Sequence, residues 1–260
     1  MSDLLDKLIE ISREVGGFLK NEQLKIQESE IEYKGRSNDM VSRADKEAEQ
    51  KFVTFLSKLL PHSGFIAEEG TSSKVGHTDN WIIDPLDGTT NYLYGIPCYC
   101  TSVALQRNGE LILGVIYDPV QDECFAAEKG KGAFLNGTRI HVSRQASLEK
   151  SLIAMGFPYD NRGRQKAYMD ILLEVNSNSR GIRRLGSAAL DMAYVAAGRF
   201  DAFYEYALNP WDVAAGAVIV SEAGGLVSDF KNTPKFIENQ TILCDNGKIH
   251  DNMLGFLKDW

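Results

Sequence analysis

One short stretch, residues 81–91, constrains the fold of this chain more than any other part of the sequence. It begins with the apolar run 81–83, which predicts a buried strand, and Pro85 predicts that this strand breaks directly after Asp84. Asp87 follows within the predicted turn. Two carboxylates beside a proline turn can converge on one hard cation such as Mg²⁺, because that ion takes oxygen ligands. The stretch therefore predicts a strand end at which a metal site can form.

Gly88, Thr89 and Thr90 follow the second carboxylate, and they predict a site for a phosphate group. Glycine lets backbone N–H groups approach an anion closely if a helix turn begins there. The same D-P-x-D-G pattern is also ordinary turn chemistry, because Asp and Gly suit turns and Pro presets φ. Taken alone, the stretch leaves a plain turn as the alternative to a metal and phosphate site.

The composition is that of an ordinary globular protein. The chain has 260 residues, of which 43% are hydrophobic and 25% charged, so it can form one large domain or two. Its net charge of −8 argues against a non-specific nucleic-acid or anionic-membrane surface, so we expect neither as a primary partner. Negative charge also repels phosphate, and bound divalent cations would resolve that conflict.

The N-terminus and the cysteines predict a cytoplasmic protein. Residues 1–18 carry acidic side chains without the continuous apolar core of a signal peptide, and no apolar run approaches membrane-spanning length. Cys98, Cys100, Cys124 and Cys244 lack the paired spacing of zinc ligands, and the histidines are scattered. We therefore expect reduced thiols rather than a zinc site or a disulfide framework.

Hydrophobic periodicity divides the chain into two halves of different character. The first half predicts an amphipathic helix within 4–19, a second helix that opens at 42–45, a strand at 65–67, a hairpin of 101–106 with 110–117, and a meander of 124–127 and 133–135. The second half alternates strands at 152–155, 182–185, 201–206, 226–227 and 241–244 with helices at 164–175, 188–197, 213–223 and 249–257. Helices layered on two sheets are the architecture that this order predicts.

A polar segment at 140–150 is the predicted seam between the halves. We therefore divide the chain into an N-terminal α+β half, residues 1–143, and a C-terminal α/β half, residues 144–260. The first half contains the antiparallel sheet and the metal and phosphate motifs. The second contains Asp212 and the residues expected on the substrate side.

Further carboxylates lie where apolar segments give way to turns. Asp212 follows Pro210 and Trp211 and precedes an Ala/Val-rich helix, which predicts the N-cap position, worth about 1 kcal/mol as a cap alone. Asp45 can likewise be explained as a capping-box partner, and Glu68 as a solvated loop residue. Turns on a rigid scaffold are nevertheless where functional sites are commonly assembled.

Taken together, these motifs make the chain resemble the inositol monophosphatase family, within the fructose-bisphosphatase-like superfamily. The resemblance rests on FIAEEG at 65–70, WIIDPLDGTTN at 81–91, WDVAAG at 211–216 and EAGG at 222–225, in the family's order and spacing. It runs from about residue 34 to residue 225, with looser matches at the ends. It implies a layered αβαβα sandwich, α+β in its first half and α/β in its second, and a Mg²⁺-dependent phosphomonoesterase that works as a homodimer.

The resemblance also implies the metal ligands. Two or three Mg²⁺ ions would be held by Glu68, Asp84, the backbone carbonyl of Leu86, Asp87 and Asp212, with Asp84 bridging two ions. Mn²⁺ is a possible substitute for Mg²⁺, and Li⁺ is expected to inhibit by replacing one Mg²⁺. Clustered carboxylates repel one another without cations, so metal binding is expected to order the site.

Catalytic and substrate-binding positions follow from the same resemblance. Thr89 would pair with Asp45 beside the attacking water, and Glu68 would help to accept the proton of that water. The N–H groups of Gly88 and Thr89 would bind the phosphate, while the backbone of Ala188 and the carboxylate of Glu205 would bind the leaving alcohol. Further positions implied near the substrate, a small phosphate ester, are Asp212 and Lys34.

The identity of the ester stays open at this point. Arg183 and Arg184 are either a solvated surface patch or a grip on a second phosphate, and the second reading makes fructose 1,6-bisphosphate a plausible substrate. Relatives that hydrolyse 3′-phosphoadenosine 5′-phosphate tend to carry Lys and an acidic residue where Thr90 and Asn91 stand, which counts against that ester. Histidinol phosphate is a lesser alternative. Residues 156–164 resemble the bacterial branch, whose substrate rim differs from that of the animal enzymes.

A non-catalytic regulatory binding protein on a retained phosphatase scaffold is the alternative from another functional class. Its signature would be the loss of a metal carboxylate, and none of the expected carboxylates is missing.

Overall fold

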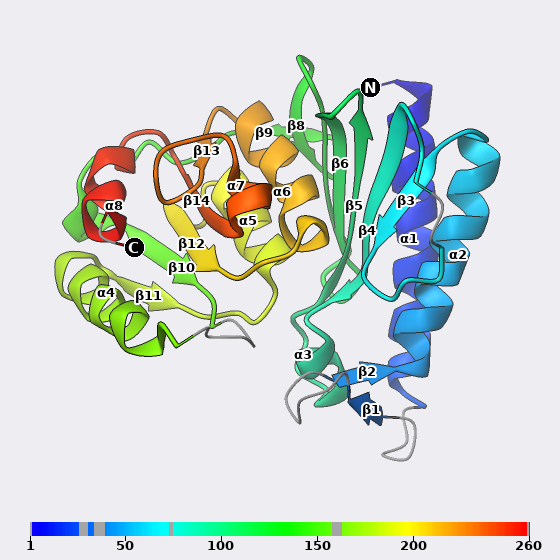
Figure 1. The fold of residues 1–260 in the computed structure, drawn as a ribbon, viewed down its shortest axis with the longest axis horizontal. Coiled ribbons are helices and arrows are strands. Elements are labelled where there is room, and N and C mark those ends of the chain that lie inside the picture. The colour runs from blue at the N-terminus through cyan, green and yellow to red at the C-terminus, as the bar shows by residue number, and fades with distance from the viewer. Residues whose placement is uncertain (1, 26–30, 34–39, 73–74, 158–162, 259) are drawn as a thin grey trace.

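The chain forms five alternating layers of helices and sheets, seen edge-on in Figure 1. The structure is a computed structural model that describes residues 2–25, 31–33, 40–72, 75–157, 163–258 and 260. Lys34, expected near the substrate, lies outside these residues, as do 158–162 of the predicted substrate rim. The layers confirm the predicted αβαβα sandwich.

The first outer layer contains two long amphipathic helices, α1 (Asp3–Gln23) and α2 (Arg43–Leu59). They cover one face of a seven-stranded sheet and pack their apolar sides around Trp81. In spatial order this sheet contains β3 (Gly64–Ala67), β4 (Asp79–Asp87), β5 (Cys100–Arg107), β6 (Glu110–Asp118), β7 (Glu123–Glu128), β8 (Gly132–Leu135) and β9 (Thr138–Ile140). β3 and β4 are parallel and the other neighbours are antiparallel.

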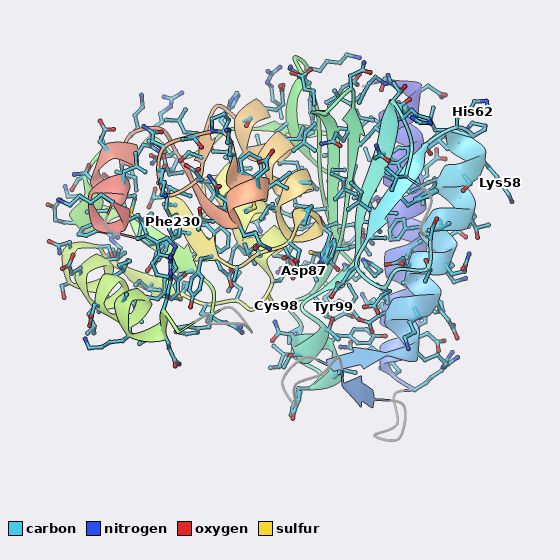
Figure 2. The ribbon with its side chains drawn as sticks, viewed as in Figure 1. Lys58, His62, Asp87, Cys98, Tyr99 and Phe230 are labelled. Atoms are coloured by element: carbon cyan, nitrogen blue, oxygen red, sulfur yellow. The ribbon has the colours of Figure 1, made fainter. Side chains whose placement is uncertain are left out.

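A five-stranded sheet forms the fourth layer. Its spatial order is β11 (Gly181–Arg183), β10 (Leu152–Met155), β12 (Ala202–Tyr206), β14 (Thr241–Asp245) and β13 (Leu226–Ser228). The outer helices α4 (Gln165–Asn178) and α8 (His250–Leu257) cover its far face, where Phe230, labelled in Figure 2, packs edge-on against Trp260. The remaining short elements are β1 (Ile31–Tyr33), β2 (Met40–Ser42), α3 (Thr89–Leu93), the 3₁₀ helix η2 (Leu148–Lys150) and α7 (Phe236–Asn239).

The central layer contains α5 (Ala188–Ala196) and α6 (Pro210–Glu222), which pack between the two sheets. Both helices are rich in alanine, so their backbones can approach their neighbours closely. At Gly114 of β6 a Cβ atom would lie 2.5 Å from the carbonyl oxygen of Ala215, and at Gly216 it would lie 2.7 Å from Met192 of α5. Gly114 thus lets α6 approach the seven-stranded sheet closely, and Gly216 lets α5 approach α6. The N-terminus of α6 and the end of β4 line the same cavity.

The prediction that the strand breaks at Pro85 is wrong. β4 continues to Asp87: it pairs with β3 as far as Ile83 and with β5 from Asp79 to Asp87. Asp84 pairs with Ser102 and Asp87 pairs with Cys100, so β4 advances three positions while β5 advances two. The extra residue is a β-bulge, which tolerates the missing N–H of proline and re-aims the side chains that follow it.

The predicted hairpin and meander are confirmed by the antiparallel pairing of β5 to β8. They were predictable because their turns are determined by neighbouring residues. Asn108 and Gly109 both have positive φ, as the tight turn between β5 and β6 requires. The short strand β9 lies partly within the segment predicted as a polar seam, and the division at residue 143 stays a prediction. Throughout the described ranges, every helix is too short or too polar for a transmembrane segment.

Candidate active site

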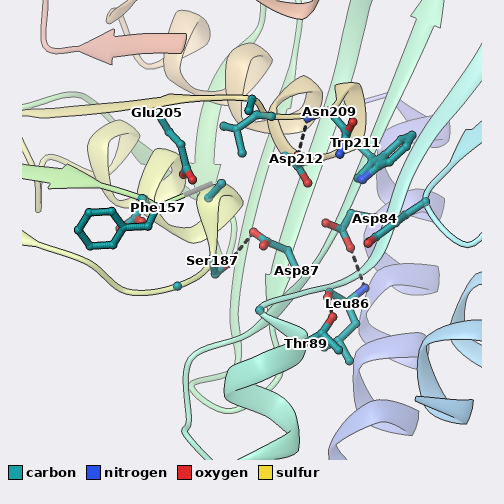
Figure 3. Close-up of a pocket in the computed structure, with 18 of the residues that line it drawn as sticks. Asp84, Leu86, Asp87, Thr89, Phe157, Ser187, Glu205, Asn209, Trp211 and Asp212 are labelled. Carbon is teal, nitrogen blue, oxygen red and sulfur yellow. Dashed lines mark hydrogen bonds between the residues drawn. The ribbon is translucent and has the colours of Figure 1, made fainter. Parts of the chain in front are cut away.

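A cavity of about 300 Å³ opens where the two sheets approach each other (Figure 3). Elements far apart in the sequence line it: the loop after β3, the end of β4, and the N-termini of α3, α5 and α6. Most of the predicted site residues lie in its wall, namely Glu68, Asp84, Leu86, Asp87, Gly88, Thr89, Arg184, Ala188, Glu205 and Asp212. Figure 2 shows Asp87 between the two sheets.

Asp84 lies just before the bulge in β4 and is only 2% exposed. Its Oδ1 accepts a hydrogen bond of 3.0 Å from the N–H of Leu86, which closes the turn within the bulge. Burial raises the pKa of the Asp84 carboxyl well above its ordinary value, and the negative charges of Glu68 and Asp87 raise it further. Such a buried carboxyl among like charges favours either a proton or a cation.

Asp87 connects the end of β4 to the beginning of α5. Its Oδ2 accepts hydrogen bonds of 2.7 Å from the Ser187 hydroxyl and 2.7 Å from the N–H of Ala189. Burial raises the pKa of Asp87, and these hydrogen bonds, with one from the N–H of Ala188, oppose that rise. Ser187 is also the N-cap of α5, accepting from the N–H of Leu190. The sequence analysis did not single out Ser187, because its contact with Asp87 has no local signal.

Asp212 is the third residue of α6, so the N-cap prediction is wrong by three positions. Asn209 is the N-cap, and its N–H donates to Asp212 Oδ2 over 2.6 Å, the reciprocal half of a capping box. Pro210 takes the first helical position, where its missing N–H leaves no gap in the helix. Burial, followed by the charge of Glu68, raises the pKa of Asp212 well above its ordinary value.

The carboxylates fit a hard cation by their chemistry. The donor set contains only oxygen atoms, and burial raises the pKa values of Asp84, Asp87 and Asp212, with neighbouring carboxylates raising those of Asp84 and Asp212 further. Within the described part of the chain, no three His, Cys, Asp or Glu side chains are already arranged around one metal position. Asp84, Asp87 and Asp212 each turn one oxygen toward an N–H or O–H group of the protein.

Glu68 is held through a residue that the sequence analysis missed. Glu49 of α2 is fully buried, and its two carboxylate oxygens accept from the N–H groups of Glu69 at 2.6 Å and Thr71 at 2.7 Å. The N–H of Glu68 itself donates to the carbonyl of Ile83 in β4. The loop after β3 is therefore fixed on both sides of Glu68. A glutamate within a helix gives no local signal of such a role.

Thr89 and Asp45 meet as predicted. The Thr89 hydroxyl lies 3.1 Å from Asp45 Oδ1 and 3.0 Å from the carbonyl oxygen of Leu86. A hydroxyl group has one proton, so it can donate fully to only one of these acceptors at a time. Asp45 is buried on α2 and contacts the cavity through Thr89 rather than lining it.

Gly88 occupies a position that only glycine fits. Its φ is +94°, and a Cβ atom there would lie 2.9 Å from the carbonyl oxygen of Cys98. Gly88 is the N-cap of α3, so a helix turn begins where the predicted phosphate site requires one. The first N–H groups of a helix have no partner within the helix, so they are free to bind an oxyanion.

The far side of the cavity contains Glu205, Ala188 and Arg184. Burial raises the pKa of the Glu205 carboxyl to about 8, with Arg184 opposing the rise. The structure separates the two arginines: β11 ends at Arg183, whose exposed guanidinium donates to the carbonyl of Ile182, whereas Arg184 lines the cavity. Of these two arginines, Arg184 is therefore the one that can contact a ligand in this cavity.

Gly156 supports Glu205 and was not identified as a site residue. A Cβ atom at position 156 would overlap the Glu205 carboxylate. We expect Gly156→Ala to displace Glu205 and to raise KM for a polyol phosphate about tenfold, since each lost hydrogen bond to a charged group costs roughly 1.5–3 kcal/mol. Steady-state kinetics check this, with Gly255→Ala as the control because a Cβ atom there meets no neighbour. An unchanged KM would show that Glu205 does not contact the substrate.

The chain is similar to known proteins over nearly its whole length. The Inositol monophosphatase family model matches residues 1–257. An inositol-1-monophosphatase of Mesorhizobium japonicum is 40% identical, covering 99% of this chain and 97% of that protein. A fructose-1,6-bisphosphatase/inositol-1-monophosphatase of Thermotoga maritima is 40% identical, covering 97% and 94%. The solved structure of extragenic suppressor protein suhB from Bartonella henselae superposes with a TM-score of 0.93 at 40% identity, covering 99% of each chain.

Proposed function

The chain belongs to the inositol monophosphatase family and is a phosphatase, and from this premise we propose that it hydrolyses inositol monophosphate or a similar polyol or sugar phosphate. One observation carries the proposal: carboxylates from three separate elements and the glycine N-cap of α3 line a single cavity. Such a constellation suits a phosphate ester, because phosphoryl transfer demands positioning and charge neutralisation more than a protein nucleophile.

The proposed cofactor is Mg²⁺, two or three ions, held by Glu68, Asp84, the carbonyl of Leu86, Asp87 and Asp212. When bound, Mg²⁺ supplies a water of lowered pKa and neutralises charge on the phosphate and on the departing alkoxide. The all-oxygen donor set supports Mg²⁺ over softer metals, with Mn²⁺ as a substitute. Li⁺ is proposed to inhibit at the same carboxylates.

The attacking water is oriented by the protein in this proposal. When the Thr89 hydroxyl donates its proton to Asp45, its oxygen can accept a hydrogen bond from the water. Glu68 then accepts the proton that the water loses. The N–H groups of Gly88 and Thr89 hold the phosphate at the start of α3, in line with the water.

The leaving alcohol is proposed to lie against α5 and β12. The Glu205 carboxyl and the backbone of Ala188 bind its hydroxyl groups, which fits a polyol. Asp212, which also lines the cavity, is proposed to bind both a metal ion and the substrate. Lys34, which is not among the described residues, is proposed to lie near the phosphate.

Arg184 favours a second candidate function. A guanidinium in the cavity wall can bind a second phosphate bidentately, and a relative of this chain carries the name fructose-1,6-bisphosphatase/inositol-1-monophosphatase. We therefore propose fructose 1,6-bisphosphate as the alternative substrate. A homodimer, a cytoplasmic location and the two halves 1–143 and 144–260 complete the proposal.

The proposal is tested by phosphate release from four esters measured side by side with Mg²⁺ and with EDTA. Inositol 1-phosphate is expected to give the highest kcat/KM, ahead of fructose 1,6-bisphosphate, histidinol phosphate and 3′-phosphoadenosine 5′-phosphate. EDTA is expected to abolish turnover, and Li⁺ to inhibit it, because the site depends on cations. Preference for the bisphosphate, lost in Arg184→Ala and kept in Arg183→Ala, would establish the second candidate instead. Protein inert toward all four esters would favour a non-catalytic binding role.

A further inference from the structure

Asp191 is a buried carboxyl group in the cavity wall to which the proposed function assigns no role. It lies in the first turns of α5 and is only 1% exposed. Neither of its carboxyl oxygens forms a hydrogen bond with any described residue, and Oδ1 is fully enclosed. Buried polar groups in proteins almost always have a partner, so this carboxyl calls for an explanation.

A comparison with Asp118 separates Asp191 from an ordinary buried carboxylate. Asp118 is equally buried and also has one enclosed oxygen without a partner. Its other oxygen, however, accepts from the N–H groups of Val120 and Gln121 and so closes the turn after β6. Asp191 closes no turn and caps no helix. The charge of Arg184 opposes part of the cost of its burial, but no hydrogen bond from a described residue does so.

Asp191 lies on the side of the cavity that is proposed to bind the leaving alcohol, and the charge of Asp87 also acts on it. It follows Ala188 by three residues in α5, so the two lie on the same face of the helix. Burial raises the pKa of Asp191 well above its ordinary value, and Glu205 is the charge that raises it most. Asp191, Glu205 and Ala188 therefore belong to one side of the cavity, with Arg184 beside them.

We propose that Asp191 determines specificity by hydrogen bonding a hydroxyl group of the leaving alcohol. The inference rests on the proposed phosphatase function. A hydroxyl group suits this position because it can donate to a carboxylate or accept from a carboxylic acid. Arg184 already supplies a positive charge on this side, so a cationic ligand is not required. An ester whose leaving group carries no further hydroxyl groups would leave Asp191 without a partner and would bind less well.

The test compares Asp191→Leu with the wild-type full-length protein on two esters in the presence of Mg²⁺. Inositol 1-phosphate has hydroxyl groups on its leaving alcohol, whereas p-nitrophenyl phosphate has none. Leucine has nearly the shape of aspartate but cannot hydrogen bond. We expect the ratio of kcat/KM for inositol 1-phosphate to kcat/KM for p-nitrophenyl phosphate to fall at least about tenfold, mainly through KM for the inositol ester. Asp191→Asn, which keeps a hydrogen-bonding group, is expected to restore most of the ratio.

Asp118→Asn is the matched control, because it neutralises a buried carboxylate outside the cavity, and its ratio is expected to equal that of the wild type. Asp191→Ala provides the same comparison if the leucine variant does not fold. If the wild type is active but the Asp191 variants keep the wild-type ratio, because neither kcat/KM value changes or both fall equally, the inference is overturned and the proposed function stands. A wild type without Mg²⁺-dependent activity toward either ester overturns the proposed function, and the inference with it.

Discussion

Asp212→Asn is expected to lower kcat by at least about 10²- to 10³-fold while leaving the fold intact, since a neutral amide cannot balance the charge of a bound cation. The fold is expected to survive because the amide oxygen can still accept from the N–H of Asn209, which keeps the capping box of α6. Circular dichroism and turnover at saturating Mg²⁺ measure the two effects separately.

Thermal unfolding in EDTA provides a second readout of the same variant. Removing one of several buried carboxylates relieves repulsion with Asp84 and Asp87, so the metal-free variant is expected to be at least as stable as the wild type. The increase in Tm on adding Mg²⁺ is expected to shrink. Asp251→Asn, an exposed acid in the first turn of α8, is the control with unchanged turnover. Near-normal turnover of Asp212→Asn would remove this residue from the metal site.

The stability of the metal-free protein is expected to fall as pH rises from about 4.5 to about 8, the ordinary and folded-state pKa values of Glu205. In this interval the folded protein retains a proton that the unfolded chain has lost, so the free energy of unfolding decreases with pH. At about 1.4 kcal/mol per pH unit, the loss from this one group reaches roughly 5 kcal/mol by pH 8. The raised pKa of Asp191 acts in the same direction.

Urea unfolding in EDTA across this pH range measures the effect. Glu205→Gln removes this titrating group, so the slope is expected to be shallower than in the wild type by up to about 1.4 kcal/mol per pH unit. The raised pKa values of Asp84, Asp191 and Asp212 leave a remaining decline with pH. Glu174→Gln, on the exposed side of α4, is the control that keeps the wild-type slope. Identical slopes for wild type and Glu205→Gln would mean that Glu205 is already ionised in the folded protein.

The parts of the fold that were predictable depend on neighbours in sequence. The turn at Asn108 and Gly109 determines the hairpin of β5 and β6, and apolar spacing determines α1 and α2. The path of β4 through Pro85 was not predictable in this way. It depends on β5, which pairs with β4 before and after the bulge that accommodates the proline, beyond the point where the pairing with β3 ends.

The same distinction applies to the site. The carboxylates of β4 and α6 were recognisable because each follows a local motif. The residues that hold them were not, because their partners are distant in sequence: Glu49 supports a loop 20 positions later, and Ser187 contacts Asp87 across 100 positions. Gly156 and Asp191 were missed for a related reason, since their roles depend on the surroundings of Glu205 rather than on their own neighbours.

The hydrogen bonds to Asp87 connect the seven-stranded sheet to the start of α5 inside the cavity. Asp87 belongs to the seven-stranded sheet, whereas its partners Ser187 and Ala189 belong to the helix layer next to the five-stranded sheet. A displacement of one sheet by about 1 Å would separate these groups and spoil the alignment that phosphoryl transfer requires. We therefore expect an intact active site to require that both sheets are docked correctly.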